Sequence, residues 1–230
     1  MTEMPVVYVR SEWEREGGRP FEGVSASGIP PLWFDKRDGK TAADNERDLL
    51  ASLSAAMEAY HAAGFGSAWD LHCAVTPSVR AALSAQGQAP LAAGFGPALL
   101  EAACVDGLCR STGLSFFAAL KGGAFGVPGD ILDALPEKPT GRMALRHTVG
   151  LADALYASEV TEPLRDGLPE SLEEVVEFYR PRYFKVKISA DAAETLPRLA
   201  RMAEILKKAG DYAVTLDGNE QFATMDAFAA

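Results

Sequence analysis

Apolar residues recur every three or four positions in two stretches of the first half of the chain, which is the spacing of one face of an α-helix. The first stretch covers residues 44–63 and ends at Gly64, and the second covers residues 97–112 and ends at Gly113. Glycine directly after such a stretch is typical of a helix C-terminus, so we predict two helices. The apolar face of the first consists of Leu49, Leu50, Leu53, Met57 and Tyr60. Small residues on the second, Ala102, Ala103 and Gly107, predict that another element approaches it closely.

The segments before these helices have extended and loop-like patterns. Residues 6–16 predict a strand that turns at Gly17 and Gly18, whereas residues 20–40 are rich in glycine, proline and serine and predict a loop. Loops of this composition often close over binding sites. The two aromatic residues of this loop, Trp33 and Phe34, are therefore candidates for substrate contact, and the alternative is that they pin the loop to the core.

The composition shifts to glycine and proline before residue 141, and we place a domain boundary near residue 140. Residues 1–140 are predicted to form an α+β domain. Residues 141–230 alternate between strand-like and helix-like patterns, which predicts βα units around a parallel sheet. The expected order is strand 143–151, helix 171–180 with a capping box of Ser171 and Glu174, strand 183–189, helix 191–210 with its regular part starting near Pro197, and strand 212–220.

The strand FKVKIS alternates between apolar residues and two lysines, Lys185 and Lys187, so both ammonium groups project from one face. The next strand alternates in the same way and ends in Asp217 on its polar face. The apolar residues of both strands are expected to pack against the helix between them. The lysines and the aspartate would then share the opposite face, near the C-terminal ends of their strands. In a (β/α)8 barrel that face is the interior, and active sites form at that end.

These residue types suit one kind of chemistry. Burial and like-charge repulsion lower the pKa of a lysine and make it available as a base. A neighbouring carboxylate can bind a hard divalent cation. A lysine base and a metal together can remove a proton beside a carboxylate and stabilise the resulting enolate.

Two motifs with a helix between them, Lys185-Val186-Lys187 and Asp217-Gly218-Asn219, resemble the enolase superfamily, and most closely its mandelate racemase and muconate lactonizing enzyme branch. Residues 97–117 are similar to the helix of that family's capping domain before the barrel. The resemblance covers essentially the whole chain. It implies an α+β capping domain over residues 1–140, followed over residues 141–230 by the first three strands of a truncated (β/α)8 barrel.

The resemblance also implies residue roles. Lys187 would be the general base, and Lys185 would tune it or contact the substrate carboxylate. Asp217 would be the first ligand of Mg²⁺, and Asn219 would lie near the site. The loop that carries Trp33 and Phe34 would lie where the capping domain closes over the substrate.

The activity that follows from the resemblance is that of a magnesium-dependent isomerase or lyase. It would abstract the proton alpha to a carboxylate of a small substrate, giving racemisation, epimerisation, cycloisomerisation or dehydration. The family has two further acidic metal ligands and a second acid or base on later strands. We therefore expect residues 1–230 to be the N-terminal part of a homo-oligomeric enzyme, inactive or nearly so by themselves.

The formal charge of the 230-residue chain, −10, argues against a nucleic-acid or anionic-membrane partner. The N-terminus lacks a signal-peptide pattern, and we expect no stretch with the roughly 20 apolar residues that span a bilayer. Three cysteines without CxxC spacing favour buried, inert thiols in a reducing cytoplasm.

Less specific interpretations stay open. The two lysines could lie on the solvated face of an edge strand, and Asp217 could be a turn residue before Gly218. The chain would then be a non-catalytic interaction module that pairs its open sheet with another chain. The histidines are not expected to form a site: His147 is interpreted as a core residue, and His61 and His72 have no partners at ligand spacing.

Overall fold

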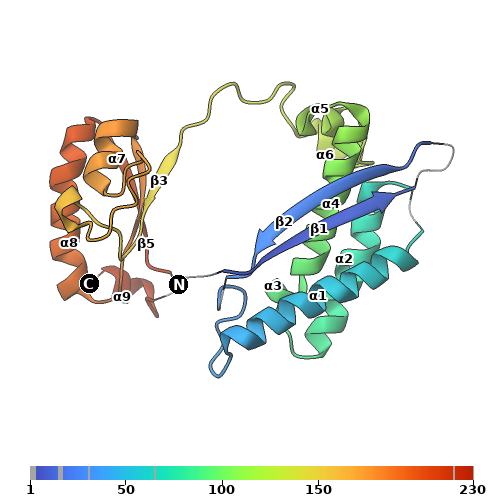
Figure 1. The fold of residues 1–230 in the computed structure, drawn as a ribbon, viewed down its shortest axis with the longest axis horizontal. Coiled ribbons are helices and arrows are strands. Elements are labelled where there is room, and N and C mark those ends of the chain that lie inside the picture. The colour runs from blue at the N-terminus through green and yellow to red at the C-terminus, as the bar shows by residue number, and fades with distance from the viewer. Residues whose placement is uncertain (1–3, 15–17, 31, 65, 220, 230) are drawn as a thin grey trace. The chain divides into compact units, whose positions relative to one another are not determined.

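The computed structural model describes residues 4–14, 18–30, 32–64, 66–219 and 221–229. The chain is mixed α/β with two small sheets, and it divides into two compact units, Met1–Pro139 and Thr140–Ala230. The division falls in the glycine- and proline-rich stretch where the sequence places a boundary. Figure 1 colours the first unit from blue to green and the second from yellow to red.

The first unit begins with an antiparallel hairpin. Strands β1 (Val6–Trp13) and β2 (Phe21–Gly28) pair from Val6 opposite Gly28 to Trp13 opposite Phe21. The prediction of a loop over residues 20–40 is therefore wrong for its first part. Strand β2 is rich in glycine and serine, as a loop would be, because it packs closely against helix α4 and only small residues fit there.

The helices of the first unit are α1 (Ala42–Ala62), α2 (Ala68–Ala85), α3 (Pro90–Ala93), α4 (Phe95–Thr112), α5 (Phe116–Lys121) and α6 (Gly129–Asp133). The helices predicted over 44–63 and 97–112 are confirmed as α1 and α4, whereas α2 is not anticipated by the sequence analysis. Leu49 and Tyr60 of α1 are buried as expected, but Leu50 and Met57 are 41% and 46% exposed. The buried face of α1 instead includes its polar residues Asn45 and Ser52.

The hairpin packs directly on α4, as Figure 1 shows. A Cβ atom added to Gly23 of β2 would lie 1.8 Å from the carbonyl oxygen of Ala103, and one added to Gly107 would lie 3.0 Å from the carbonyl oxygen of Glu22. The predicted close approach to the small residues of α4 is thus confirmed. The stretch Pro90–Thr112 is also apolar and long enough to cross a membrane by length and composition, contrary to expectation. More than half of its most apolar window is buried, as in the core helix of a globular unit.

The second unit has the alternation that the sequence predicts. Its three strands, β3 (Arg146–Val149), β4 (Tyr183–Lys187) and β5 (Ala213–Asp217), form a parallel sheet with β4 in the centre. The helical segments are η1 (Ala157–Glu159), α7 (Leu172–Tyr179), α8 (Ala192–Leu206), η2 (Lys207–Ala209) and α9 (Met225–Ala229). A three-stranded sheet of this kind is compatible with the start of a barrel, and the barrel and the capping domain remain predictions.

Helices α7 and α8 pack against one face of this sheet. Phe184 and Val186 of β4 are buried there together with Met202 and Ile205 of α8. The expectation that β5 packs equally well is wrong, because Val214 and Leu216 are 41% and 43% exposed. Strand β5 lies at the edge of the sheet, and the core formed with α8 is centred on β4.

Local signals set the ends of these helices. The Ser171–Glu174 capping box is present, with the Glu174 carboxylate accepting from both the amide and the hydroxyl of Ser171. Helix α8 starts earlier than predicted, at Ala192 after its cap Asp191, so Pro197 lies inside the helix. The Asp191 cap starts the helix six residues before the proline.

Candidate functional site

The register of the parallel sheet brings the predicted residues to one place. Lys187 of β4 is opposite Asp217 of β5, and Lys185 is opposite Thr215. All four side chains project from the face opposite Phe184 and Val186. Lys187 and Asp217 are the last residues of their strands, so the residues converge at the carboxyl edge of the sheet.

Both lysines contact the same carboxylate oxygen. The ammonium groups of Lys185 and Lys187 lie 2.6 Å and 2.7 Å from Oδ2 of Asp217. Two cations and one anion leave a formal charge of +1 on this lysine–aspartate cluster. Asp217 therefore offsets part of the repulsion between the two ammonium groups.

Asn219 completes the cluster from the turn after β5. Its backbone N–H donates to Oδ1 of Asp217 at 3.0 Å, and its side-chain Oδ1 accepts a hydrogen bond from Lys187. Asn219 has a left-handed backbone, which asparagine tolerates better than most residues. Asp217 thus acts both as a turn residue and as an ion-pair partner, and its role as a metal ligand stays a prediction.

The environment of the cluster is intermediate between solvent and core. The side chains of Lys185, Lys187 and Asp217 are 29%, 21% and 23% exposed. Hydrogen bonds from Lys185, then Lys187, then the Asn219 N–H hold the pKa of Asp217 well below its usual range. The carboxylate is therefore charged across the physiological pH range.

The donor set does not match a magnesium site by itself. Mg²⁺ prefers several oxygen ligands in octahedral geometry, and its protein sites use carboxylates that face the ion. In the described part of the chain, no group of three or more histidine, cysteine, aspartate or glutamate side chains is placed to hold a metal. The one carboxylate of the cluster already accepts from two ammonium groups. Asp217 could supply at most one ligand.

Trp33 and Phe34 lie in the other unit and are not part of this cluster. Trp33 is 57% exposed, with the Lys36 ammonium 5.5 Å from its ring centroid. Phe34 packs edge-on against Phe95, with ring centroids 5.3 Å apart. Phe34 therefore anchors the loop to the core, which was the alternative to substrate contact, whereas the exposed Trp33 does not.

The segment that carries these aromatics is held by Asp35, which the sequence analysis did not single out. The Asp35 carboxylate is buried and accepts from Arg37 Nε and Nη2 at 2.8 Å and 2.6 Å. Its backbone N–H and C=O pair with the side-chain amide of Asn45. The Arg37 guanidinium holds the pKa of Asp35 at about 2. A buried charge with this many partners is a structural anchor.

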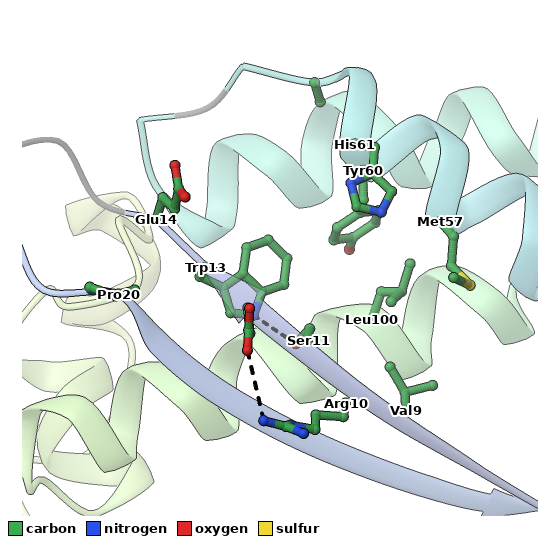
Figure 2. Close-up of a pocket in the computed structure, with 12 residues that line it drawn as sticks. Val9, Arg10, Ser11, Trp13, Glu14, Pro20, Met57, Tyr60, His61 and Leu100 are labelled. Atoms are coloured by element: carbon green, nitrogen blue, oxygen red, sulfur yellow. Dashed lines mark hydrogen bonds and ion pairs between the residues drawn. The ribbon is translucent and has the colours of Figure 1, made fainter.

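A cavity with a volume of about 870 Å³ lies between β1 and α1. Figure 2 shows the indole of Trp13 and the ring of Tyr60 facing it, with Arg10 at its rim. Arg10 is already paired with Glu22 at 2.6 Å and with Glu12 at 3.7 Å. Burial raises the pKa of Tyr60, so its hydroxyl stays protonated. We assign no chemistry to this cavity.

A second cavity, of about 500 Å³, contains an unexpected pair. Nδ1 of His72 on α2 lies 2.7 Å from Oε2 of Glu101 on α4. The sequence shows no partner for His72 at ligand spacing, because the partner comes from a different helix. Arg80 and Phe34 line the same cavity.

The structure agrees with the expectations for His147 and Cys104 but not with the one for Cys73. His147 is half-buried against Phe184, and burial lowers its pKa, as for a core histidine. Cys104 is buried, and burial raises the pKa of its thiol to about 12. Cys73 is exposed, so the expectation of buried thiols is wrong for this residue. Its place on the outer face of α2 explains the difference.

Comparisons with known proteins add no family to this description. No protein-family model, no curated protein and no solved structure matches the chain. The resemblance to the enolase superfamily therefore rests on the two motifs and on the similarity of residues 97–117.

Proposed function

We propose that this chain carries the proton-transfer residues of an enzyme that acts on small carboxylates. The reaction is removal of the proton on the carbon beside the carboxylate, as the resemblance to the mandelate racemase and muconate lactonizing enzymes implies. The observation that supports it is the convergence of Lys185 and Lys187 on one carboxylate oxygen, 2.6 Å and 2.7 Å away, at the carboxyl edge of a parallel sheet.

The proposed roles follow from charge and position. The substrate carboxylate pairs with the Lys185 ammonium through a charge-assisted contact. Lys187 loses its ammonium proton to water and then takes the α-proton, and the electron pair of the broken C–H bond moves into the carboxylate to form an enolate. Asn219 Oδ1 accepts from Lys187 and orients its amine.

The outcome of the reaction depends on what happens to the enolate. Return of the proton gives racemisation or epimerisation, and internal attack or loss of a leaving group gives cycloisomerisation or dehydration. Magnesium belongs to the proposal only together with acidic ligands that the described residues do not supply. No step above is assigned to the metal.

Hydrogen–deuterium exchange at the α-carbon tests the proposal. Small carboxylates are incubated in D2O with the complete protein that the open reading frame encodes, and loss of the α-proton signal is followed by NMR. Lys187→Ala should abolish exchange, whereas Lys207→Ala, a matched change of an exposed lysine paired with Glu204, should not. Exchange that persists in Lys187→Ala would remove this residue from the base role.

The coding sequence after residue 230 gives a second test. An open reading frame that continues into strands ending in Glu or Asp, with a later Lys or His, supports the enzyme. Exchange should then be measured on the longer product as well as on residues 1–230. A stop codon at that point supports the alternative below.

The alternative function is a non-catalytic interaction module. It is favoured by the exposed apolar face of the edge strand β5, where Val214 and Leu216 are 41% and 43% exposed. Edge strands with apolar residues pair readily with other chains. Sedimentation of the protein and of Leu216→Asp distinguishes the two: self-association that the substitution abolishes supports the module.

A further inference from the structure

The cavity that contains His72 and Glu101, here called the His72 cavity, has polar groups on one helix. His72, Thr76 and Arg80 are spaced by four residues along α2, so they follow one another on the same face. The Thr76 hydroxyl lies 3.4 Å from His72 Nδ1, between the imidazole and the arginine. One face of α2 therefore presents a hydroxyl and a guanidinium side by side to the cavity.

The charged groups of the His72 cavity differ in their partners. Glu101 is engaged by His72 at 2.7 Å. In the part of the chain that the structure describes, no carboxylate forms an ion pair with the exposed Arg80, so its guanidinium is available to an anionic ligand. A guanidinium presents a fork of donors that fits a carboxylate in a bidentate manner.

Part of the lining of the His72 cavity is apolar. Phe34 and Phe95 form an edge-on aromatic pair there, and Leu99 of α4 continues the surface. A volume of about 500 Å³ falls in the range of small-molecule sites, which combine an apolar lining with a few convergent polar groups. The shape and the lining thus suit a ligand with an apolar body and one anionic end.

We propose that the His72 cavity binds a small aromatic or aliphatic monocarboxylate. The carboxylate pairs with Arg80 and accepts from the Thr76 hydroxyl, and the apolar body lies against Phe34 and Phe95. The proposal does not depend on the lysine–aspartate cluster, because every residue of the His72 cavity belongs to the first unit. With a formal charge of −10, the chain does not attract anions at long range, so affinity comes from these local contacts.

The experiment uses 3-phenylpropionate as the probe and its uncharged amide as the matched comparison. Calorimetry on the whole chain should give a dissociation constant on the order of 1 mM for the acid. The amide and the Arg80→Gln variant should each bind about tenfold more weakly or worse, because a charge-assisted contact is lost. NMR should show that the His72 imidazole signal, assigned with His72→Gln, moves on addition of the acid.

Two control variants locate the ligand. Arg47→Gln removes an exposed arginine that pairs with Asp44 and should leave the affinity unchanged. The double variant Lys185→Gln/Lys187→Gln should also leave it unchanged, which separates this site from the proposed active site. Affinity that survives Arg80→Gln, affinity lost in the lysine variant, or no saturable binding at ten times the expected constant would each overturn the proposal.

Discussion

Gly23 of β2 lies directly on the backbone of Ala103 in α4, and a Cβ atom at position 23 would be 1.8 Å from the Ala103 carbonyl oxygen. We predict that Gly23→Ala lowers the free energy of unfolding by about 2–3 kcal/mol, because the hairpin has to move away from the helix. Gly129→Ala is the control, since nothing lies within 4 Å of the added carbon. Urea unfolding of the two variants checks the prediction, and equal stabilities would contradict this contact.

Asp35 anchors the segment that carries Trp33 and Phe34, so Asp35→Asn should destabilise the protein by about 2 kcal/mol. The neutral amide cannot replace the paired carboxylate, and Arg37 and Lys40 lose their buried anion. Asp38→Asn, which changes an exposed residue on the same segment, should cost less than about 0.5 kcal/mol. Thermal unfolding at neutral pH measures both, and a larger effect at Asp38 would refute the anchoring role.

The contribution of Asp35 should also depend on pH. Its folded pKa of about 2 is below its ordinary value of 3.8, so the charged form is favoured by folding. The stabilisation is fully present above pH 4 and is lost as the pH falls towards 2. The difference in unfolding free energy between wild type and Asp35→Asn should therefore shrink over that interval. A difference that stays constant from pH 6 to pH 2 would show that the charge is not its source.

Pro197 lies inside α8, where it supplies no N–H for the bond to Ala193. We predict that Pro197→Ala raises the free energy of unfolding by about 1–3 kcal/mol. Pro90→Ala, at the first position of α3, is the matched control and should change stability little, because proline is favoured there. Unfolding in guanidinium compares the two substitutions, and a Pro197→Ala protein less stable than wild type would show that the ring itself is needed.

Asp217 offsets the repulsion between two ammonium groups, so Asp217→Asn should destabilise the second unit. The loss should be smaller at about 1 M salt, where the repulsion is screened. Lys185→Gln in the Asp217→Asn background should recover part of the stability, whereas Lys185→Gln alone should not stabilise the wild type. Urea unfolding of the four proteins at low and high salt forms a double-mutant cycle. Strictly additive effects would show that the pair does not interact.

The hydrophobic pattern of the sequence was sufficient to predict burial wherever a helix covers the apolar face of the strand. The alternation in β4 correctly separates buried Phe184 and Val186 from Lys185 and Lys187, because one helix-covered face fixes the strand's register. The same alternation fails at Val214 and Leu216, where the strand lies at an edge. Burial depends on the neighbouring element as well as on the period.

Long-range contacts account for most of what the sequence could not show. Strand β2 has the composition of a loop because Gly23 has to fit against α4, a tertiary demand that local propensity does not record. His72 and Glu101 are 29 positions apart in the sequence and lie on different helices. In contrast, the Lys185–Asp217 pair was predictable, because parallel strands bring their carboxyl ends to one edge.

Buried apolar residues and charged residues alternate along strand β4. Phe184 and Val186 are buried in the core, whereas Lys185 and Lys187 form ion pairs with Asp217 on the other face. Substitutions at the charged positions should therefore leave the packing of Phe184 and Val186 against α8 unchanged. The two faces of this strand can therefore be varied independently, one for packing and one for charge.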